Sequence, residues 1–129
     1  MSATATVLDA SAVLAIVLDE DGGALVSAKL PGALISAANW AEVIERTIGS
    51  NADAAALRPA FEALGVSIVP VNVGQAEAAA HLRGPTRPLG LSLADRLCFA
   101  LAVELRAPVL TADRKWSEVE VGVEVRVIR

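Results

Sequence analysis

The chain has 129 residues, of which 54% are hydrophobic, and it carries fifteen acidic side chains against eleven basic ones. This length predicts a single domain over residues 1–129, and a net charge of −4 excludes phosphate attraction by the surface as a whole. The apolar content exceeds the roughly 45 to 50% of average soluble proteins, so we expect part of it to lie in an interface.

Short β-rich apolar segments alternate with helical patterns along the chain. The predicted strands are residues 5–8, 33–36, 66–71, 108–111 and 123–128. The predicted helices are 11–18, 22–30, 39–49, 53–64, 73–83 and 92–106, with a short one at 114–119. This alternation predicts an α/β fold with three layers (α/β/α) and a mostly parallel five-stranded sheet. The strict alternation of Val123, Val125 and Val127 predicts that the last strand lies at an edge.

Several protein classes are disfavoured by composition. The apolar stretch from Ala12 to Leu18 is far shorter than the roughly 18 residues of a membrane span, and the segment MSATAT lacks the charged start of a secretory signal. We therefore expect a soluble, cytoplasmic protein without a membrane partner. The single cysteine, Cys98, excludes an internal disulfide and a cysteine metal cluster, and its apolar neighbours predict core packing. Two Trp, two Phe and no Tyr argue against a module that stacks unpaired bases.

Four carboxylates fall at or near the starts of predicted helices. They are Asp9, Glu42, Asp95 and Asp113. Backbone capping explains each of them singly, because Asn39 and Ser92 stand three residues before Glu42 and Asp95, as in a capping box, and the other two acids suit N-cap positions. The turns that follow parallel strands also share one crevice, however, so the four acids are candidates for a common site.

A common site of four carboxylates requires a cation. Their mutual repulsion would raise some pKa values or destabilise the fold, and a divalent ion removes that repulsion. Oxygen ligands without histidine or cysteine suit Mg²⁺, with Mn²⁺ as a substitute. We therefore predict that Asp9, Glu42, Asp95 and Asp113 are both metal ligands and catalytic residues.

The histidine content narrows the chemistry further. His81 is the only histidine, and it lies in an alanine-rich predicted helix. A mechanism that needs two histidines is therefore excluded, and a Ser-His-Asp triad would have to use His81. Attack of metal-activated water on a phosphodiester needs no histidine. Ser11 and Thr111 are candidates to hold a metal-bound water or a phosphate, although local backbone capping explains them equally well.

Basic residues gather in two places. Arg83, Arg87 and Arg96 are predicted to lie on a Gly/Pro-rich loop that leads into the Asp95 helix, and Arg114 follows Asp113 directly. They are candidates to hold an RNA backbone beside the metal. Solvated loop charges, with Arg96 on a helix face shared with Glu104, are an equally good explanation.

Four segments together resemble the PIN-domain ribonucleases of the VapC toxin type from toxin-antitoxin pairs. They are VLDASA (7–12), NWAEV (39–43), LSLADRLCFALA (91–102) and PVLTADRKW (108–116). The order and spacing match over essentially the whole chain. This resemblance implies that the same four acids form the metal site, with Thr111 as a polar residue beside it. It further implies metal-dependent endonucleolytic cleavage of RNA, a homodimer, and neutralisation by a small antitoxin that covers the site.

Two other classes of α/β protein fit the sequence poorly, and one alternative function remains. A phosphatase with an Asp-x-Asp pair fits poorly, because Ser11 stands where the second Asp is needed, and a receiver domain would need an acidic neighbour beside Asp9. The main alternative is a non-catalytic protein-binding module of PIN-like fold, in which every acid is a helix cap. That module would bind no metal.

Overall fold

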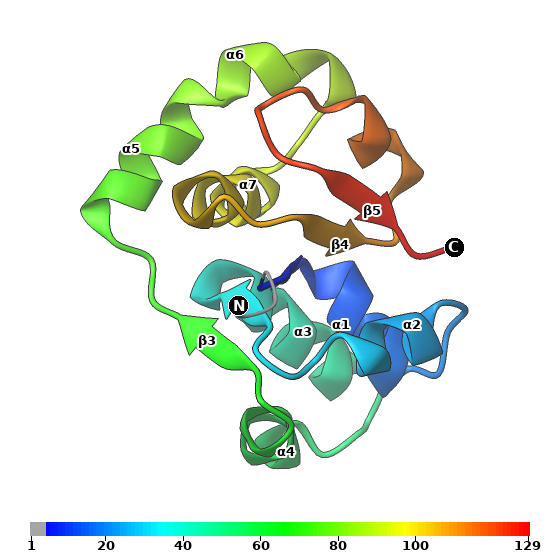
Figure 1. The fold of residues 1–129 in the computed structure, drawn as a ribbon. Coiled ribbons are helices and arrows are strands. Elements are labelled where there is room, and N and C mark those ends of the chain that lie inside the picture. The colour runs from blue at the N-terminus through cyan, green and yellow to red at the C-terminus, as the bar shows by residue number, and fades with distance from the viewer. Residues whose placement is uncertain (1–4) are drawn as a thin grey trace.

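The computed structural model describes residues 5–129, and its centre is one five-stranded sheet (Figure 1). The strands are β1 (Val7–Leu8), β2 (Leu34–Ser36), β3 (Ser67–Val69), β4 (Val109–Thr111) and β5 (Val125–Val127). Their order is β3-β2-β1-β4-β5, and every pairing is parallel. The predicted five-stranded sheet is confirmed, and β5 lies at its edge as predicted.

Helices connect all the strands except β4 and β5, which a short 3₁₀ turn joins. The α-helices are α1 (Ala10–Val17), α2 (Gly23–Ala28), α3 (Ala37–Gly49), α4 (Leu57–Ala63), α5 (Val73–His81), α6 (Arg83–Thr86) and α7 (Leu93–Leu105). The 3₁₀ helices are η1 (Ala54–Ala56), η2 (Arg87–Leu89) and η3 (Arg114–Glu118). Polar side chains begin several of them, as Ser36 does for α3 and Ser92 for α7. Within residues 5–129, no helix has the length and apolar character to span a bilayer.

The helices form two layers that cover opposite faces of the sheet (Figure 1). On one face, Leu8 and Ile35 pack with apolar residues of α1 to α4. On the other face, Val7 and Val109 pack with α7 and η3, where Cys98, Phe99 and Trp116 are buried. Adjacent strand residues point to opposite faces, so each short strand contributes to both cores. The predicted three-layer α/β/α arrangement and the core position of Cys98 are confirmed.

Two local predictions were wrong. The helix that carries Glu42 begins at Ala37, with Ser36 as its N-cap, so Asn39 is not a cap and Glu42 lies beyond the first turn. The Ser36 hydroxyl takes the capping role because it accepts a hydrogen bond from the Ala38 N–H. The Gly/Pro-rich segment before the Asp95 helix is also not an open loop, since it contains α6 and η2.

The strand order reverses between β1 and β4. The chain extends the sheet from β1 through β2 to β3 on one side, and from β4 to β5 on the other. In open parallel sheets, ligands bind in the crevice at the carboxyl ends of the strands beside such a reversal. Asp9 directly follows β1, and Thr111 ends β4.

Candidate active site

Asp9 is a buried carboxylate that bridges the two halves of the sheet. It is 4% exposed and is the N-cap of α1, where its Oδ1 accepts a hydrogen bond of 2.8 Å from the Ala12 N–H. Its Oδ2 accepts a hydrogen bond of 2.6 Å from the Thr111 hydroxyl on β4. Ser11 donates to the same carboxylate at 2.7 Å from Oδ1 and 2.8 Å from Oδ2. The side chain is thus held in one orientation at the crevice.

Ser11 and Thr111 link this carboxylate to the turn after β4. The Ser11 Oγ accepts a hydrogen bond of 2.8 Å from the Ala112 N–H, and the Thr111 Oγ1 accepts one of 3.0 Å from the Asp113 N–H. Each hydroxyl therefore donates a hydrogen bond to Asp9 and accepts one from the turn after β4. Ser11 and Thr111 thus both contact Asp9, whereas their predicted contact with a water or phosphate stays a prediction.

Burial makes the charge of Asp9 costly. Desolvation raises the pKa of Asp9 from its ordinary 3.8 to about 6, although hydrogen bonds from Thr111, Ser11 and the Ala12 N–H oppose the shift. The nearby charge of Asp95 raises this pKa further. Burial likewise raises the pKa of Glu42, and repulsion from Asp95 and Glu45 adds to that shift. Asp9, Glu42 and Asp95 therefore share one electrostatic environment, although they come from three helices.

Asp95 has a second role as a cap. Its Oδ2 accepts a hydrogen bond of 2.9 Å from the Ser92 N–H, while the Ser92 hydroxyl accepts one of 3.1 Å from the Asp95 N–H. This reciprocal capping box begins α7, as the sequence predicts. Since only one of its oxygens is used, capping does not preclude a role for Asp95 beside Asp9.

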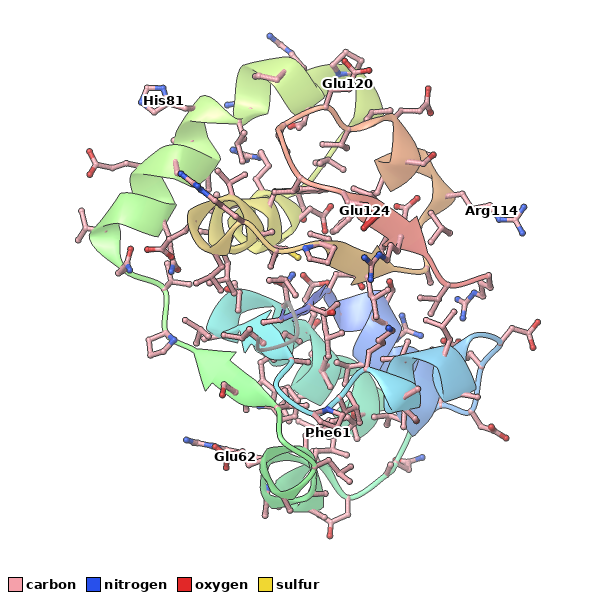
Figure 2. The ribbon with its side chains drawn as sticks, viewed as in Figure 1. Phe61, Glu62, His81, Arg114, Glu120 and Glu124 are labelled. Carbon is pink, nitrogen blue, oxygen red and sulfur yellow. The ribbon has the colours of Figure 1, made fainter. Side chains whose placement is uncertain are left out.

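Asp113 and Arg114 are less involved in this group. The Asp113 carboxylate caps η3 by accepting a hydrogen bond from the Lys115 N–H at 3.0 Å, and its link to Thr111 is made by its backbone. Arg114 is exposed at the margin of the molecule, where its Nε donates to the carbonyl of Arg129 (Figure 2). Ligation by Asp113 and RNA contact by Arg114 both stay predictions. His81 is an exposed residue at the end of α5, as predicted (Figure 2).

The acids of the described residues do not form a closed cluster of metal ligands. Within residues 5–129, no three His, Cys, Asp or Glu side chains are grouped closely enough to enclose an ion. In the same part of the chain, the ion pairs join other residues, so no Lys or Arg neutralises Asp9, Glu42 or Asp95. Mg²⁺ commonly uses one or two carboxylates, with waters and substrate phosphates as its other ligands. Asp9 and Asp95, with Glu42 nearby, can supply that number.

Asn39 is a buried residue of the site that the sequence interpretation assigned to a cap instead. It is 1% exposed, and its Nδ2 donates a hydrogen bond of 3.2 Å to the Ala94 carbonyl. This bond ties α3, which carries Glu42, to α7, which carries Asp95. Asn39 and Glu42 lie three residues apart and so on neighbouring positions of one helix face, a spacing that was available as a signal.

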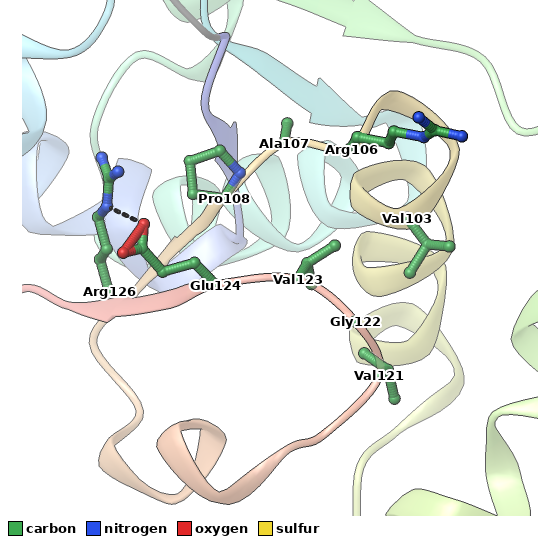
Figure 3. Close-up of a pocket in the computed structure, with 9 residues that line it drawn as sticks. All are labelled: Val103, Arg106, Ala107, Pro108, Val121, Gly122, Val123, Glu124 and Arg126. Carbon is green, nitrogen blue, oxygen red and sulfur yellow. Dashed lines mark hydrogen bonds and ion pairs between the residues drawn. The ribbon is translucent and has the colours of Figure 1, made fainter.

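A cavity of the described residues lies away from the acidic site. It has a volume of about 550 Å³ and lies between the end of α7 and the segment that leads into β5 (Figure 3). Pro108 and Glu124, which line it, precede β4 and β5, so this cavity is at the amino ends of the strands. The acidic site is at the carboxyl ends, where parallel sheets bind their ligands.

Comparison with solved structures finds the same fold in several proteins of toxin-antitoxin systems. A toxin-antitoxin complex from Klebsiella pneumoniae matches with a TM-score of 0.78 and 19% identity, covering 96% of this chain and 98% of that one. VapC20 from Mycobacterium tuberculosis, a Sarcin-Ricin loop cleaving toxin, matches with a TM-score of 0.71 and 18% identity over 92% and 98% of the two chains. VapBC-1 from nontypeable Haemophilus influenzae gives 0.68 and 19% over 95% and 97%. At these identities the similarity establishes the fold.

Sequence comparison establishes the family. No curated protein matches the sequence significantly. The family model described as the PIN domain matches residues 6–122, which is most of the chain and contains all four predicted acids. The chain therefore belongs to the PIN domain family.

Proposed function

We propose that this chain is a metal-dependent endoribonuclease that acts as the toxin of a toxin-antitoxin pair. The observation that carries the proposal is Asp9, a buried carboxylate at the strand-order reversal with a pKa of about 6 and two acidic neighbours but no cationic partner. A structural cap does not need this burial. Membership in the PIN domain family and the similarity to a toxin that cleaves an RNA loop support the same assignment.

The residues of the chain have distinct roles in this proposal. Mg²⁺ or Mn²⁺ would lower the pKa of a water and offset the charge on the phosphoryl oxygens. Asp9 and Asp95 would hold the ion, with Glu42 and Asp113 at its margin. Ser11 and Thr111 keep the Asp9 carboxylate oriented by donating hydrogen bonds to it. Asn39 keeps the helices of Glu42 and Asp95 in register.

The proposed partners are RNA, a small antitoxin protein that covers the acidic site, and a second copy of the chain. Several solved structures of similar fold are toxin-antitoxin complexes, which supports an antitoxin partner. Three exposed apolar side chains are candidates for the predicted interface, since Val73 is 75% exposed, Ile48 62% and Leu93 55%. Such apolar exposure favours contact with other chains.

The alternative is a non-catalytic binding module in which the acids only cap helices. The caps formed by Asp9, Asp95 and Asp113 favour it, whereas Glu42 caps nothing. Thermal melting of the wild type, Asp95→Asn and Ser92→Ala, each with and without Mn²⁺, separates the two. Ser92→Ala removes the cap but keeps the carboxylate, so it should cost about 0.5 to 2 kcal/mol without removing the Mn²⁺ response.

The nuclease proposal expects a specific pattern in that series. Mn²⁺ raises the melting temperature of the wild type and Ser92→Ala, and raises that of Asp95→Asn much less. Metal-free Asp95→Asn is at least as stable as the wild type, because one of the repelling charges is removed. Mapping of cut sites in total RNA should show cleavage by the wild type and none by Asp95→Asn. A wild type that neither responds to Mn²⁺ nor cuts RNA would favour the binding module.

A further inference from the structure

Three arginines line one pocket, and no acidic residue is part of its lining. The pocket has a volume of about 270 Å³ and is lined by Arg83, Arg87, Gly90, Leu91 and Arg96. It lies where α6 and η2 approach the start of α7. The ion pairs among residues 5–129 involve Arg58, Arg126 and Arg129, and therefore none of the three pocket arginines. In a chain of net charge −4, this pocket is a local concentration of unbalanced positive charge.

Arg96 forms a fixed wall of this pocket. Its Nη1 donates a hydrogen bond of 2.9 Å to the Ala79 carbonyl on α5, and its Nε is buried without an acceptor. Arg96 is therefore half-buried against α5 rather than fully solvated. A buried N–H without a partner is costly, so this guanidinium keeps unsatisfied donor capacity beside the pocket. Arg83 and Arg87 are exposed, so they are free to approach an anion from the open side.

The chemistry of the lining favours a phosphate. Guanidinium groups present planar pairs of donors that match phosphate oxygens, and arginine is only weakly hydrated. Gly90 adopts a left-handed conformation with φ of 64°, which turns the chain into Leu91 and the N-cap Ser92. The pocket is thereby placed beside the first turn of α7.

The pocket and the acidic site share that first turn. Asp95 and Arg96 are consecutive, so their side chains diverge by about 100° around the α7 axis. Asp95 acts on the charges of Asp9 and Glu42, whereas Arg96 contacts α5. The acids repel the phosphates of any RNA strand laid across them. An RNA strand bound there needs positively charged side chains close by, and the arginine pocket adjoins the same first turn of α7.

We propose that the pocket of Arg83, Arg87 and Arg96 is a subsite for a backbone phosphate of the RNA strand, next to the nucleotide held at the acidic site. The identity of the polymer rests on the proposed endoribonuclease function. The phosphate chemistry of the pocket rests on the arginines themselves. Contacts from the guanidinium groups to phosphate oxygens fix the position of the backbone and carry no base preference.

Binding in the absence of metal tests this subsite apart from catalysis. A short fluorescein-labelled oligouridylate is titrated with protein in EDTA over a series of salt concentrations, and fluorescence anisotropy gives Kd. The test variant is Arg83→Gln with Arg87→Gln, since both side chains are exposed and their loss should spare the fold. The control is Arg58→Gln with Arg126→Gln, which removes two exposed charges elsewhere. Inorganic phosphate as a competitor shows whether a free ion occupies the subsite equally well.

The test variant should bind the oligouridylate at least about fivefold more weakly, with a salt slope smaller by roughly 1. The control should match the wild type, and all three proteins should melt alike. Equal Kd values and slopes for wild type and test variant would overturn the subsite, as would equal losses in test variant and control. If the pocket variant loses binding but the wild type never cuts RNA with Mn²⁺, the subsite stands and the nuclease proposal fails.

Discussion

The stability of the metal-free protein should depend on pH through Asp9. Burial raises the pKa of this carboxyl from 3.8 to about 6, so the folded state binds the proton more tightly than the unfolded chain does. Asp9 therefore favours folding while it is protonated in both states, and this contribution is lost as the pH rises from 3.8 to about 6. One pKa unit corresponds to about 1.4 kcal/mol, so the full change is about 3 kcal/mol.

The variant Asp9→Asn isolates this effect because it keeps the shape but has no charge to titrate. Asn also disturbs the hydrogen bonds from Thr111 and Ser11, but that cost does not change with pH. The difference in unfolding free energy between wild type and variant is the quantity to follow. Between about pH 4 and about pH 7.5 it should shift by about 2 kcal/mol against the wild type, since part of the titration already lies below that range.

Urea unfolding in EDTA, followed by tryptophan fluorescence and extrapolated linearly to water, measures this difference. Trp116 is 2% exposed, so unfolding changes its surroundings completely. Asp53→Asn is the matched control, because Asp53 also caps a helix through a backbone N–H but is exposed to water. If wild type and Asp9→Asn keep a constant difference over this pH range, burial does not penalise the Asp9 charge and the reasoning fails.

Two further substitutions test the support around the acids. Thr111→Val removes the 2.6 Å hydrogen bond to Asp9, so it should raise the pKa of Asp9 above about 6 and lower the unfolding free energy at neutral pH by about 1.5 to 3 kcal/mol in the same urea assay. A smaller loss at acidic pH is expected, and a loss independent of pH would argue against a charged Asp9. Asn39→Ala removes the bond to the Ala94 carbonyl and should cost about 1 kcal/mol, while RNA cleavage falls by more than this loss of folded protein explains. Unchanged cleavage would remove Asn39 from the positioning of the site.

The sequence was sufficient to predict the fold class, whereas the metal site stays a prediction. Alternating apolar and helical segments indicated a parallel sheet, and a carboxylate directly after a strand indicated a ligand site at its end. Hydrogen bonds join Asp9 to Ser11 and to Thr111, although Thr111 lies far from the other two residues in the chain. Strand order could not be derived from alternation alone, because it depends on which helices pack on which face.

The parts that sequence could not predict depend on packing between distant helices. Asn39 suits an N-cap equally well in isolation, and only the contact of α3 with α7 shows that its amide reaches the Ala94 carbonyl. The sequence pattern suggested a surface charge for Arg96, whereas in the structure its guanidinium donates a hydrogen bond to the Ala79 carbonyl of α5. Gly and Pro residues between 84 and 90 suggested a loop, yet short helices tolerate them near their ends, where fewer backbone bonds are at stake.

The bond between Asp9 and Thr111 joins residues that are 102 positions apart. Contacts of such long sequence separation raise the contact order and form late, because the loop between them must close first. During synthesis the segment with Asp9 emerges well before Thr111 does. A nascent chain that has not yet reached Thr111 therefore lacks the hydroxyl that orients the Asp9 carboxylate, and this part of the site cannot form until that residue has been added.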